Sequence, residues 1–178
     1  NAHWKYSRET LIGRFPRIMT NPTRFTQSRI SPSGQPGNVF EQVMSHCPGA
    51  MAKWWNLECE LRFDGLIEPD IKEEIRRSMA PEVGCQFCAS LAPVKDEYVN
   101  PRESLAVAYA MLLAKDPRNI DDAVFTVLRE EFTEPEIVEL TLWSLFMIAS
   151  QAFGAVLKIP AASDEEITSY SLSRGTTV

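Results

Sequence analysis

The stretch EEIRRSMAPEVGCQFCASLAP, residues 73–93, says most about the architecture of this chain. It continues an apolar face on which isoleucine or methionine recurs every four positions, at Ile67, Ile71, Ile75 and Met79. This spacing predicts an amphipathic helix that buries one side. Pro81 is predicted to end that helix, and Gly84 to turn the chain into a second helix that begins at the Cys85-x-x-Cys88 pair.

The rest of the chain has the same helical periodicity. Further helices are predicted at residues 39–47, 49–65, 101–115, 119–128 and 134–158. Thr133, followed three positions later by Glu136, forms a capping-box pattern at the start of the longest of them. We therefore predict an all-α domain of six to eight helices over residues 39–160, with an extended arm before it (1–38) and a polar tail after it (161–178).

The composition and the distribution of charge limit the possible partners. With 178 residues, 44% of them hydrophobic, the chain is expected to fold as one globular domain. The net charge is −6, but the arm alone carries six basic residues and one acidic residue. These charges are scattered among proline, glycine and serine, so we expect no nucleic-acid binding. The arm is at least as well suited to an acidic neighbouring subunit of a homo-oligomer.

The cysteine count and the hydropathy pattern favour a cytoplasmic protein. No segment resembles a signal peptide, and four cysteines are too few for a disulfide-stapled secreted scaffold. The most apolar run, residues 140–153, is shorter than a membrane span. It is therefore expected to be a buried helix and not a membrane anchor.

Two cysteines at the start of a helix have a definite chemistry. The unpaired N–H groups of the first turn favour thiolate over thiol, and the two-residue spacer lets Cys85 and Cys88 form a disulfide. The pair alone is compatible with a redox couple, with half of a zinc site and with incidental core thiols. A structural zinc site needs further ligands. The remaining candidates are scattered: Cys47, Cys59, His46 and His3.

Glu73 lies on the helix that leads into the cysteine pair. A partly buried carboxylate beside a thiol can take up its proton and return it. The alternative is a solvated helix face that Glu73 shares with Lys72, Arg76 and Arg77. No motif for a bound flavin, haem or nicotinamide is present, so no cofactor is expected.

Glu73, eleven further residues and then Cys85-x-x-Cys88 resembles the Glu-x11-Cys-x-x-Cys-x3-His motif of the AhpD-like / carboxymuconolactone decarboxylase superfamily. Four other segments are also similar to this family: GLIEPDIKEEIRRS, ESLAVAYAMLLAKDP, FTEPEIVEL and AFGAVLKIP. The resemblance spans residues 39–160 and implies an alkylhydroperoxidase-like, all-helical subunit that assembles as a trimer or hexamer. The lactone decarboxylase branch generally lacks the cysteine pair, which argues against that branch here.

By position, the resemblance implies that Cys88 is the peroxidatic cysteine, Cys85 the resolving cysteine and Glu73 the proton acceptor. It implies a hydroperoxide or disulfide substrate and an external dithiol reductant, such as a lipoyl group or a thioredoxin-like protein. The sequence departs from the motif at Ala92, which occupies the position of the histidine. Losing one member of an acid–base relay typically removes a factor of about 10² to 10⁴ in rate.

Two other functions stay open. One is a helical oligomeric scaffold or redox sensor that keeps the cysteine pair without turnover. The other is a zinc-stabilised helical domain, which a chelator would destabilise. His46 could replace the missing histidine through space, although nothing in the sequence supports this beyond its presence.

Overall fold

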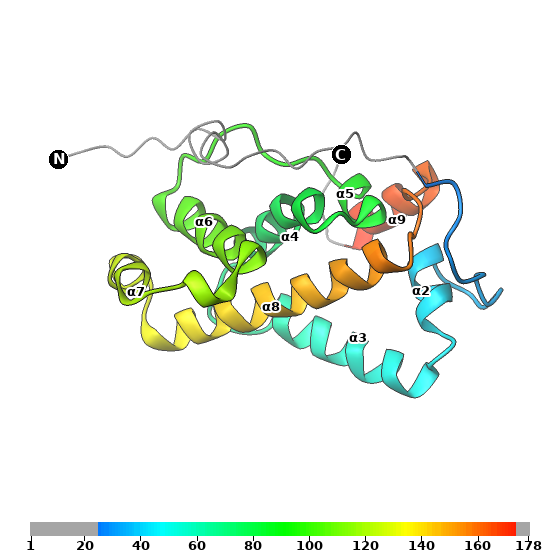
Figure 1. Cartoon of the computed structure of the whole chain (residues 1–178), viewed down its shortest axis with the longest axis horizontal. Helices are drawn as coiled ribbons and strands as arrows, with labels where there is room; N and C mark the ends of the chain where they lie inside the picture. Colours follow the sequence, from blue (N-terminus) through cyan, green and yellow to red (C-terminus); the bar gives the residue numbers. More distant parts are fainter. Residues whose placement is uncertain (1–24, 174–178) are drawn as a thin grey trace.

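The computed structural model describes residues 25–173 of the chain. Over these residues it has eight α-helices, one 3-10 turn and no β-strand, so the predicted all-α fold is confirmed (Figure 1). The elements follow in the order α2 (Val39–Met44), α3 (Pro48–Phe63), α4 (Pro69–Val83), α5 (Gln86–Ser90), α6 (Pro101–Lys115), η1 (Pro117–Asn119), α7 (Asp122–Leu128), α8 (Glu134–Val156) and α9 (Asp164–Ser173).

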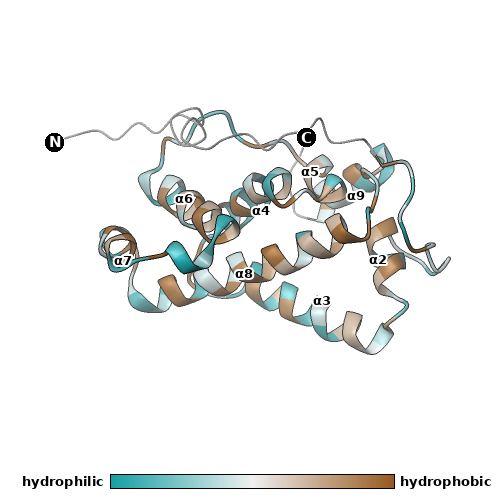
Figure 2. Cartoon of the chain, viewed as in Figure 1, coloured by the Kyte–Doolittle hydropathy of each residue, from teal (hydrophilic) through white to brown (hydrophobic). Residues whose placement is uncertain are grey.

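The helix α4 lies at the centre of the fold, in contact with α5, α6 and α8. The apolar face predicted from its four-residue spacing is confirmed, because every one of its members is at most 4% exposed: Ile67, Ile71, Ile75 and Met79. They share one core with Leu140 and Trp143 of α8. Figure 2 shows apolar residues recurring along the whole of α8. Burial of these facing apolar sides is the main force that holds α4 against α8.

The helix α4 is longer than predicted, because Pro81 lies inside it and does not end it. A proline in the last turn removes only one helical hydrogen bond, so the helix continues past it. It ends instead at Gly84, whose φ of +88° lies in the left-handed region that glycine adopts without strain. The N–H groups of Gly84 and Cys85 both donate to the carbonyl of Ala80, at 3.0 and 3.1 Å. The chain therefore turns directly from α4 into the cysteine pair.

A buried ion pair joins the start of α4 to α8. The Lys72 ammonium, 1% exposed, lies 2.7 Å from Oε1 of Glu139 and donates to the carbonyl of Asp64 at 3.0 Å. The Glu139 carboxylate also accepts hydrogen bonds from the N–H groups of Leu66 and Ile67. The turn between α3 and α4 is thus fixed to α8, which sets the position of α4 relative to the rest of the core.

One side of α8 is buried and the other is exposed. Of the described helices, α8 alone is long and apolar enough to cross a membrane by length and composition, a test that the core helix of a soluble protein also passes. Leu140, Trp143 and Ser144 are fully buried, whereas Val138 and Leu142 are more than half exposed. The predicted burial of this helix therefore applies to one face.

The tail forms a helix that the sequence analysis does not predict. Where the sequence predicts only a polar tail over residues 161–178, residues Asp164–Ser173 form α9. Ser163 and Glu166 cap its start reciprocally, since the N–H of Glu166 donates to Ser163 and the N–H of Ser163 donates to the Glu166 carboxylate. Figure 1 shows α9 at the same end of the molecule as α2 and α5.

The described part of the N-terminal arm lies on its own chain. Arg29 donates to the carbonyls of Leu157 and Val156 at the end of α8, at 2.8 and 2.9 Å. The N–H of Phe25 donates to the side chain of Gln86, between the two cysteines, at 2.8 Å. The other five basic residues predicted to contact a neighbouring subunit belong to residues 1–24, outside the described part of the chain.

Candidate active site

The cysteine pair forms a disulfide at the start of α5. Cys85 and Cys88 have their Cα atoms 5.3 Å apart, within the usual range for a disulfide. Cys85 is the N-terminal capping residue of α5, and its sulfur accepts a hydrogen bond from the N–H of Cys88 at 3.2 Å. Because α5 has only five residues, its own dipole is small, and the charged side chains around it determine the electrostatics of the pair.

The two sulfurs lie in different environments. Cys85 is completely buried. It lies so close to Gly154 of α8 that a Cβ atom added to this glycine would be 2.5 Å from the Cys85 sulfur. Cys88 is 7% exposed and lines a cavity. Of the two, Cys88 is therefore the residue that a small molecule in the cavity can meet.

The cavity has a volume of about 730 Å³ and lies between α2, α3, α5, α8 and α9. Much of its wall is formed by aromatic residues and methionines: Phe40, Met44, Met51, Trp54, Trp55, Phe87 and Met147. Its polar lining includes Arg62, Arg76 and Tyr170. Glutamates and serines from α2, α3, α8 and α9 also line it, among them Glu41, Glu58, Glu165 and Glu166, so the wall combines an apolar part with a polar and charged part. A cavity of this size with both kinds of lining can hold a small organic molecule.

Glu73 lies at the centre of a buried ionic cluster. Arg76 donates to both of its carboxylate oxygens, at distances between 2.9 and 3.1 Å. Arg62 and Arg77 each donate to it at 3.2 Å. The hydroxyl of Tyr170 donates to Oε2 at 3.0 Å. Glu73 is only 6% exposed, so the alternative of a solvated helix face is wrong for this residue.

The surroundings of Glu73 determine its protonation. Burial by itself raises the pKa of the Glu73 carboxyl, but the charges of Arg76 and Arg62 and the hydrogen bonds from Arg76 and Tyr170 outweigh it. The pKa of Glu73 therefore lies below its ordinary value, and the group is a carboxylate at neutral pH. A carboxylate of this kind can accept a proton but holds it weakly.

Arg76 connects this carboxylate to α5, the helix that begins at the cysteine pair. Its Nη1 donates to the carbonyl of Cys88 at 2.7 Å, while its other nitrogens bind Glu73. The ring of Tyr170 covers the guanidinium, whose carbon lies 5.2 Å from the ring centroid. The carbonyl of Arg76 accepts a hydrogen bond from the side-chain amide of Gln151 at 2.8 Å. Arg76 thus fixes the distance between the ionic cluster and the cysteine pair.

Two residues that line the cavity each have a buried polar atom without a hydrogen-bond partner among the described residues. One is the side-chain oxygen of Gln151, an acceptor, and the other is Nε1 of Trp54, a donor. The Gln151 amide cannot be turned around, because its oxygen would then face the carbonyl of Arg76. Unpaired buried groups of this kind are costly and often mark the place of a ligand or a bound water.

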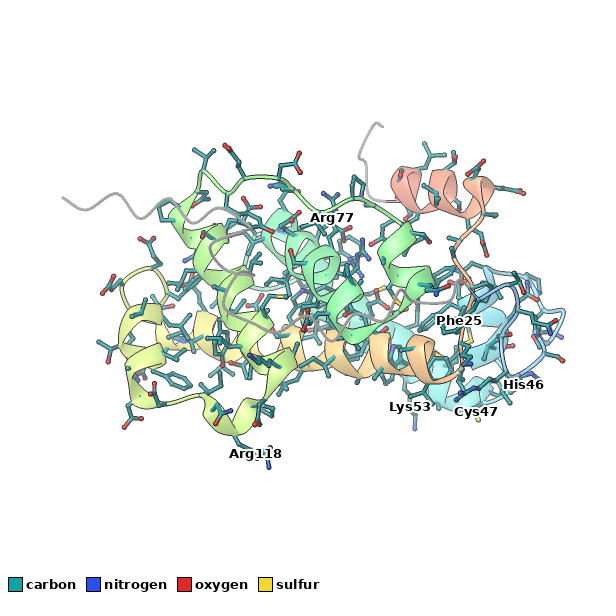
Figure 3. All side chains as sticks on the ribbon, turned by 45° about the horizontal axis from the view of Figure 1, so that its top comes forward. Phe25, His46, Cys47, Lys53, Arg77 and Arg118 are labelled. Carbon is teal, nitrogen blue, oxygen red and sulfur yellow. A yellow bond between two sulfur atoms is a disulfide. The ribbon has the colours of Figure 1, made fainter. Side chains whose placement is uncertain are left out.

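His46 does not replace the missing histidine. Its Nε2 is 2.9 Å from the carbonyl of Ser31, and Figure 3 shows it beside Cys47 at the edge of the molecule. Within the described part of the chain, the cavity lining contains no histidine. No group of three or more metal-binding side chains gathers anywhere in residues 25–173 either. The two remaining cysteines, Cys47 and Cys59, are free thiols.

Sequence reasoning missed Arg62, Gln151 and Tyr170 as members of the site. Arg62 and Gln151 come from distant helices and carry no local pattern that links them to the cysteine pair. Tyr170 could have been found, because the Ser163-x-x-Glu166 spacing is a capping-box signature that predicts a helix after it.

The fold is similar to that of a protein whose crystal structure is known. No family profile matches the sequence, and no curated protein does. An uncharacterized peroxidase-related protein from Silicibacter sp. TM1040 aligns with a TM-score of 0.65 at 12% sequence identity, over 75% of this chain and 80% of that chain. At this identity the similarity shows the fold alone, which is consistent with an AhpD-like helical domain.

Gly154→Ala is expected to destabilise the protein by about 1–3 kcal/mol, because the new methyl group would overlap the Cys85 sulfur and approach Phe40. This loss outweighs the gain of about 1 kcal/mol that alanine gives over glycine within a helix. Gly49→Ala is the matched control, since nothing lies within 4 Å of its added methyl group. Urea unfolding of the oxidised protein measures both, and equal midpoints would contradict the close contact at Cys85.

Proposed function

We propose that this protein is a thiol oxidoreductase that reduces hydroperoxides or exchanges disulfides through the Cys85–Cys88 couple. The observation that carries the proposal is the asymmetry of the pair, in which Cys88 lines a cavity and Cys85 lies buried beside it. A peroxidatic thiol must meet substrate, and a resolving thiol needs only to reach the first sulfur. The similarity to the fold of a peroxidase-related protein is in keeping with this assignment.

The reaction has three steps. The Cys88 thiolate attacks the terminal oxygen of the hydroperoxide ROOH, the O–O bond breaks, and the alkoxide takes a proton to leave as ROH. The sulfur is thereby oxidised to sulfenic acid. The Cys85 thiol then attacks that sulfur, which releases water and forms the disulfide. An external dithiol, such as a lipoyl group or a thioredoxin-like protein, reduces the disulfide and is itself oxidised.

Glu73 is proposed to accept the thiol proton of Cys88. It is ionised at neutral pH, as an acceptor must be. Its lowered pKa means that it holds the proton only briefly, which suits a group that transfers the proton onward. Arg76 fixes both participants, because it binds the Glu73 carboxylate and the Cys88 carbonyl at once.

The proposed substrate is an uncharged organic hydroperoxide. The aromatic and methionine-rich wall of the cavity suits an apolar body. A hydroperoxide group donates one hydrogen bond and accepts others, so it is chemically suited to pair with the Gln151 oxygen as a donor or with the Trp54 N–H as an acceptor. The two arginines in the cavity are already paired, Arg62 with Glu58 and Arg76 with Glu73, so neither favours a carboxylate on the substrate.

The remaining features of the proposal follow from the sequence. The reductant is expected to be external and the protein cytoplasmic, with no cofactor, nucleic acid or membrane as a partner. The alternative function is a scaffold or redox sensor that keeps the disulfide without turnover. Ala92, at the position of the family's histidine, is the observation that favours this alternative.

A homo-oligomer, trimer or hexamer, is also proposed. Val138, Leu142 and Leu145 are between 44% and 60% exposed and recur on one face of α8. An exposed apolar face of this kind is typical of a surface that another subunit covers.

Cys88→Ser is expected to abolish consumption of cumene hydroperoxide by the reduced protein, because the attacking sulfur is lost. Cys85→Ser should still react once per chain and then stop at the sulfenic acid, since no resolving thiol remains. Cys47→Ser, which removes an exposed free thiol outside the cavity, is the control. Peroxide consumption and trapping of sulfenic acid measure all three variants, and undiminished consumption in Cys88→Ser would rule out the proposed function.

Leu142→Glu is expected to lower the molar mass in light scattering from that of a trimer or hexamer towards that of a monomer, because a charge would be buried in the subunit interface. Val99→Glu, at a residue that is 90% exposed on the 91–100 connection, is the control and should leave the mass unchanged. A monomeric wild-type protein would refute the assembly.

A further inference from the structure

We propose that the hydroxyl of Tyr170, on α9, is a proton carrier of the active site and takes the place of the motif histidine, whose position is occupied by Ala92, so that α9 completes the active site. This inference rests on the proposed function, and it assigns the step that Ala92 leaves without a residue. Tyr170 lies 82 residues after Cys88, outside the segment that resembles the family.

The position of Tyr170 is the first argument. Its hydroxyl donates to Oε2 of Glu73 at 3.0 Å, its ring covers the guanidinium of Arg76, and it lines the same cavity as Cys88. It also packs against the apolar cluster that contains both cysteines. One side chain therefore connects the proposed proton acceptor with the space in which the substrate would react.

The hydrogen bonds that hold α9 against α5 and α2 are the second argument. The N–H of Ala162, just before α9, donates to the hydroxyl of Ser90 in α5 at 2.8 Å. The Glu166 carboxylate of α9 accepts from the N–H of Val39 at the start of α2, also at 2.8 Å. The helix that carries Tyr170 is thus bound to α5 itself and to α2, two elements that form walls of the cavity, so its hydroxyl has a defined place.

The other described groups that bind Glu73, and the two positions considered for the histidine, cannot take this role. Arg62, Arg76 and Arg77 keep their protons at any physiological pH, so they hold charge but do not transfer protons. His46 is bound at the edge of the molecule, and Ala92 has no proton to give. Among the described residues that hydrogen-bond to Glu73, Tyr170 is the one with a group that can donate a proton and take one back.

The electrostatics agree with this geometry. Burial raises the pKa of the Tyr170 phenol, and the charge and hydrogen bond of Glu73 raise it further, against the opposing effect of Arg76 and Arg62. The phenol is therefore neutral and protonated at neutral pH, whereas the pKa of Glu73 is lowered and that group is ionised. Two neighbouring groups with pKa values driven apart are typical of an acid–base pair.

The proton then follows a balanced path. The thiol proton of Cys88 moves to the Glu73 carboxylate, and the thiolate attacks ROOH. The protonated Glu73 donates to the Tyr170 oxygen, while the phenolic proton goes to the leaving alkoxide to form ROH. Tyr170 ends as a neutral phenol and Glu73 as a carboxylate, so both groups return to their starting states within the one oxidation of Cys88.

Tyr170→Phe tests the proposal, because it removes the hydroxyl and keeps the ring over Arg76. The second-order rate constant for oxidation of the reduced protein by cumene hydroperoxide is expected to fall by about 10²-fold at neutral pH. Tyr98→Phe is the matched control. Tyr98 also donates to a buried carboxylate, Glu74, at 3.0 Å and also has a raised pKa, but it lies outside the cavity. Its rate constant should stay at the wild-type value.

Added imidazole separates a proton-transfer role from a structural one. Imidazole can carry protons through the cavity, so it should restore part of the rate of Tyr170→Phe and leave the wild-type rate nearly unchanged. A Tyr170→Phe rate within about threefold of wild type would overturn the proposal. The proposal would also be overturned if imidazole did not restore the rate constant of Tyr170→Phe, or if Tyr98→Phe lowered the rate constant equally. If Cys88→Ser still consumes hydroperoxide, the proposed function itself fails. If Cys88→Ser is inactive but Tyr170→Phe keeps the wild-type rate, the thiol chemistry is retained and only the role of Tyr170 is refuted.

Discussion

The buried carboxylate of Glu73 is the constraint on which the rest of the site depends. A carboxylate removed from water costs several kcal/mol unless counter-charges and hydrogen bonds compensate it. Here Arg62 comes from α3, Arg76 from the turn of α4 that follows Glu73, and Tyr170 from α9. Three helices must therefore converge on one residue. The cluster fixes the packing at this end of the molecule and, at the same time, the charge beside the thiol pair.

The asymmetry of the two sulfurs follows from how α5 is held. Arg76 binds the carbonyl of Cys88 from one side, and Gly154 lets the sulfur of Cys85 approach α8 from the other. Cys85 is thereby enclosed, and Cys88 is left at the cavity wall. A glycine in α8 and an arginine in α4 thus determine which of the two cysteines lines the cavity.

The sequence predicts the parts of this structure that local patterns encode. The four-residue spacing from Ile67 to Met79 identifies the buried face of α4, and the spacing of Glu73 and the cysteines places them on consecutive helices. Arg62 could not be predicted in the site, because a charged residue on a helix normally faces solvent and its burial depends on a carboxylate from another helix. The helix α9 is mostly polar and lacks a wide apolar stripe, so periodicity does not reveal it, although its capping box does.

The proposed chemistry requires Cys88, and not Cys85, to be the thiol presented to the cavity. Alkylation of the reduced protein with a limited amount of iodoacetamide, followed by mass spectrometry of its peptides, tests this most directly. We expect Cys88 to be modified first at neutral pH, with Cys85 protected until Cys88 has reacted. Modification of Cys85 first, or of both cysteines at equal rates, would contradict the account.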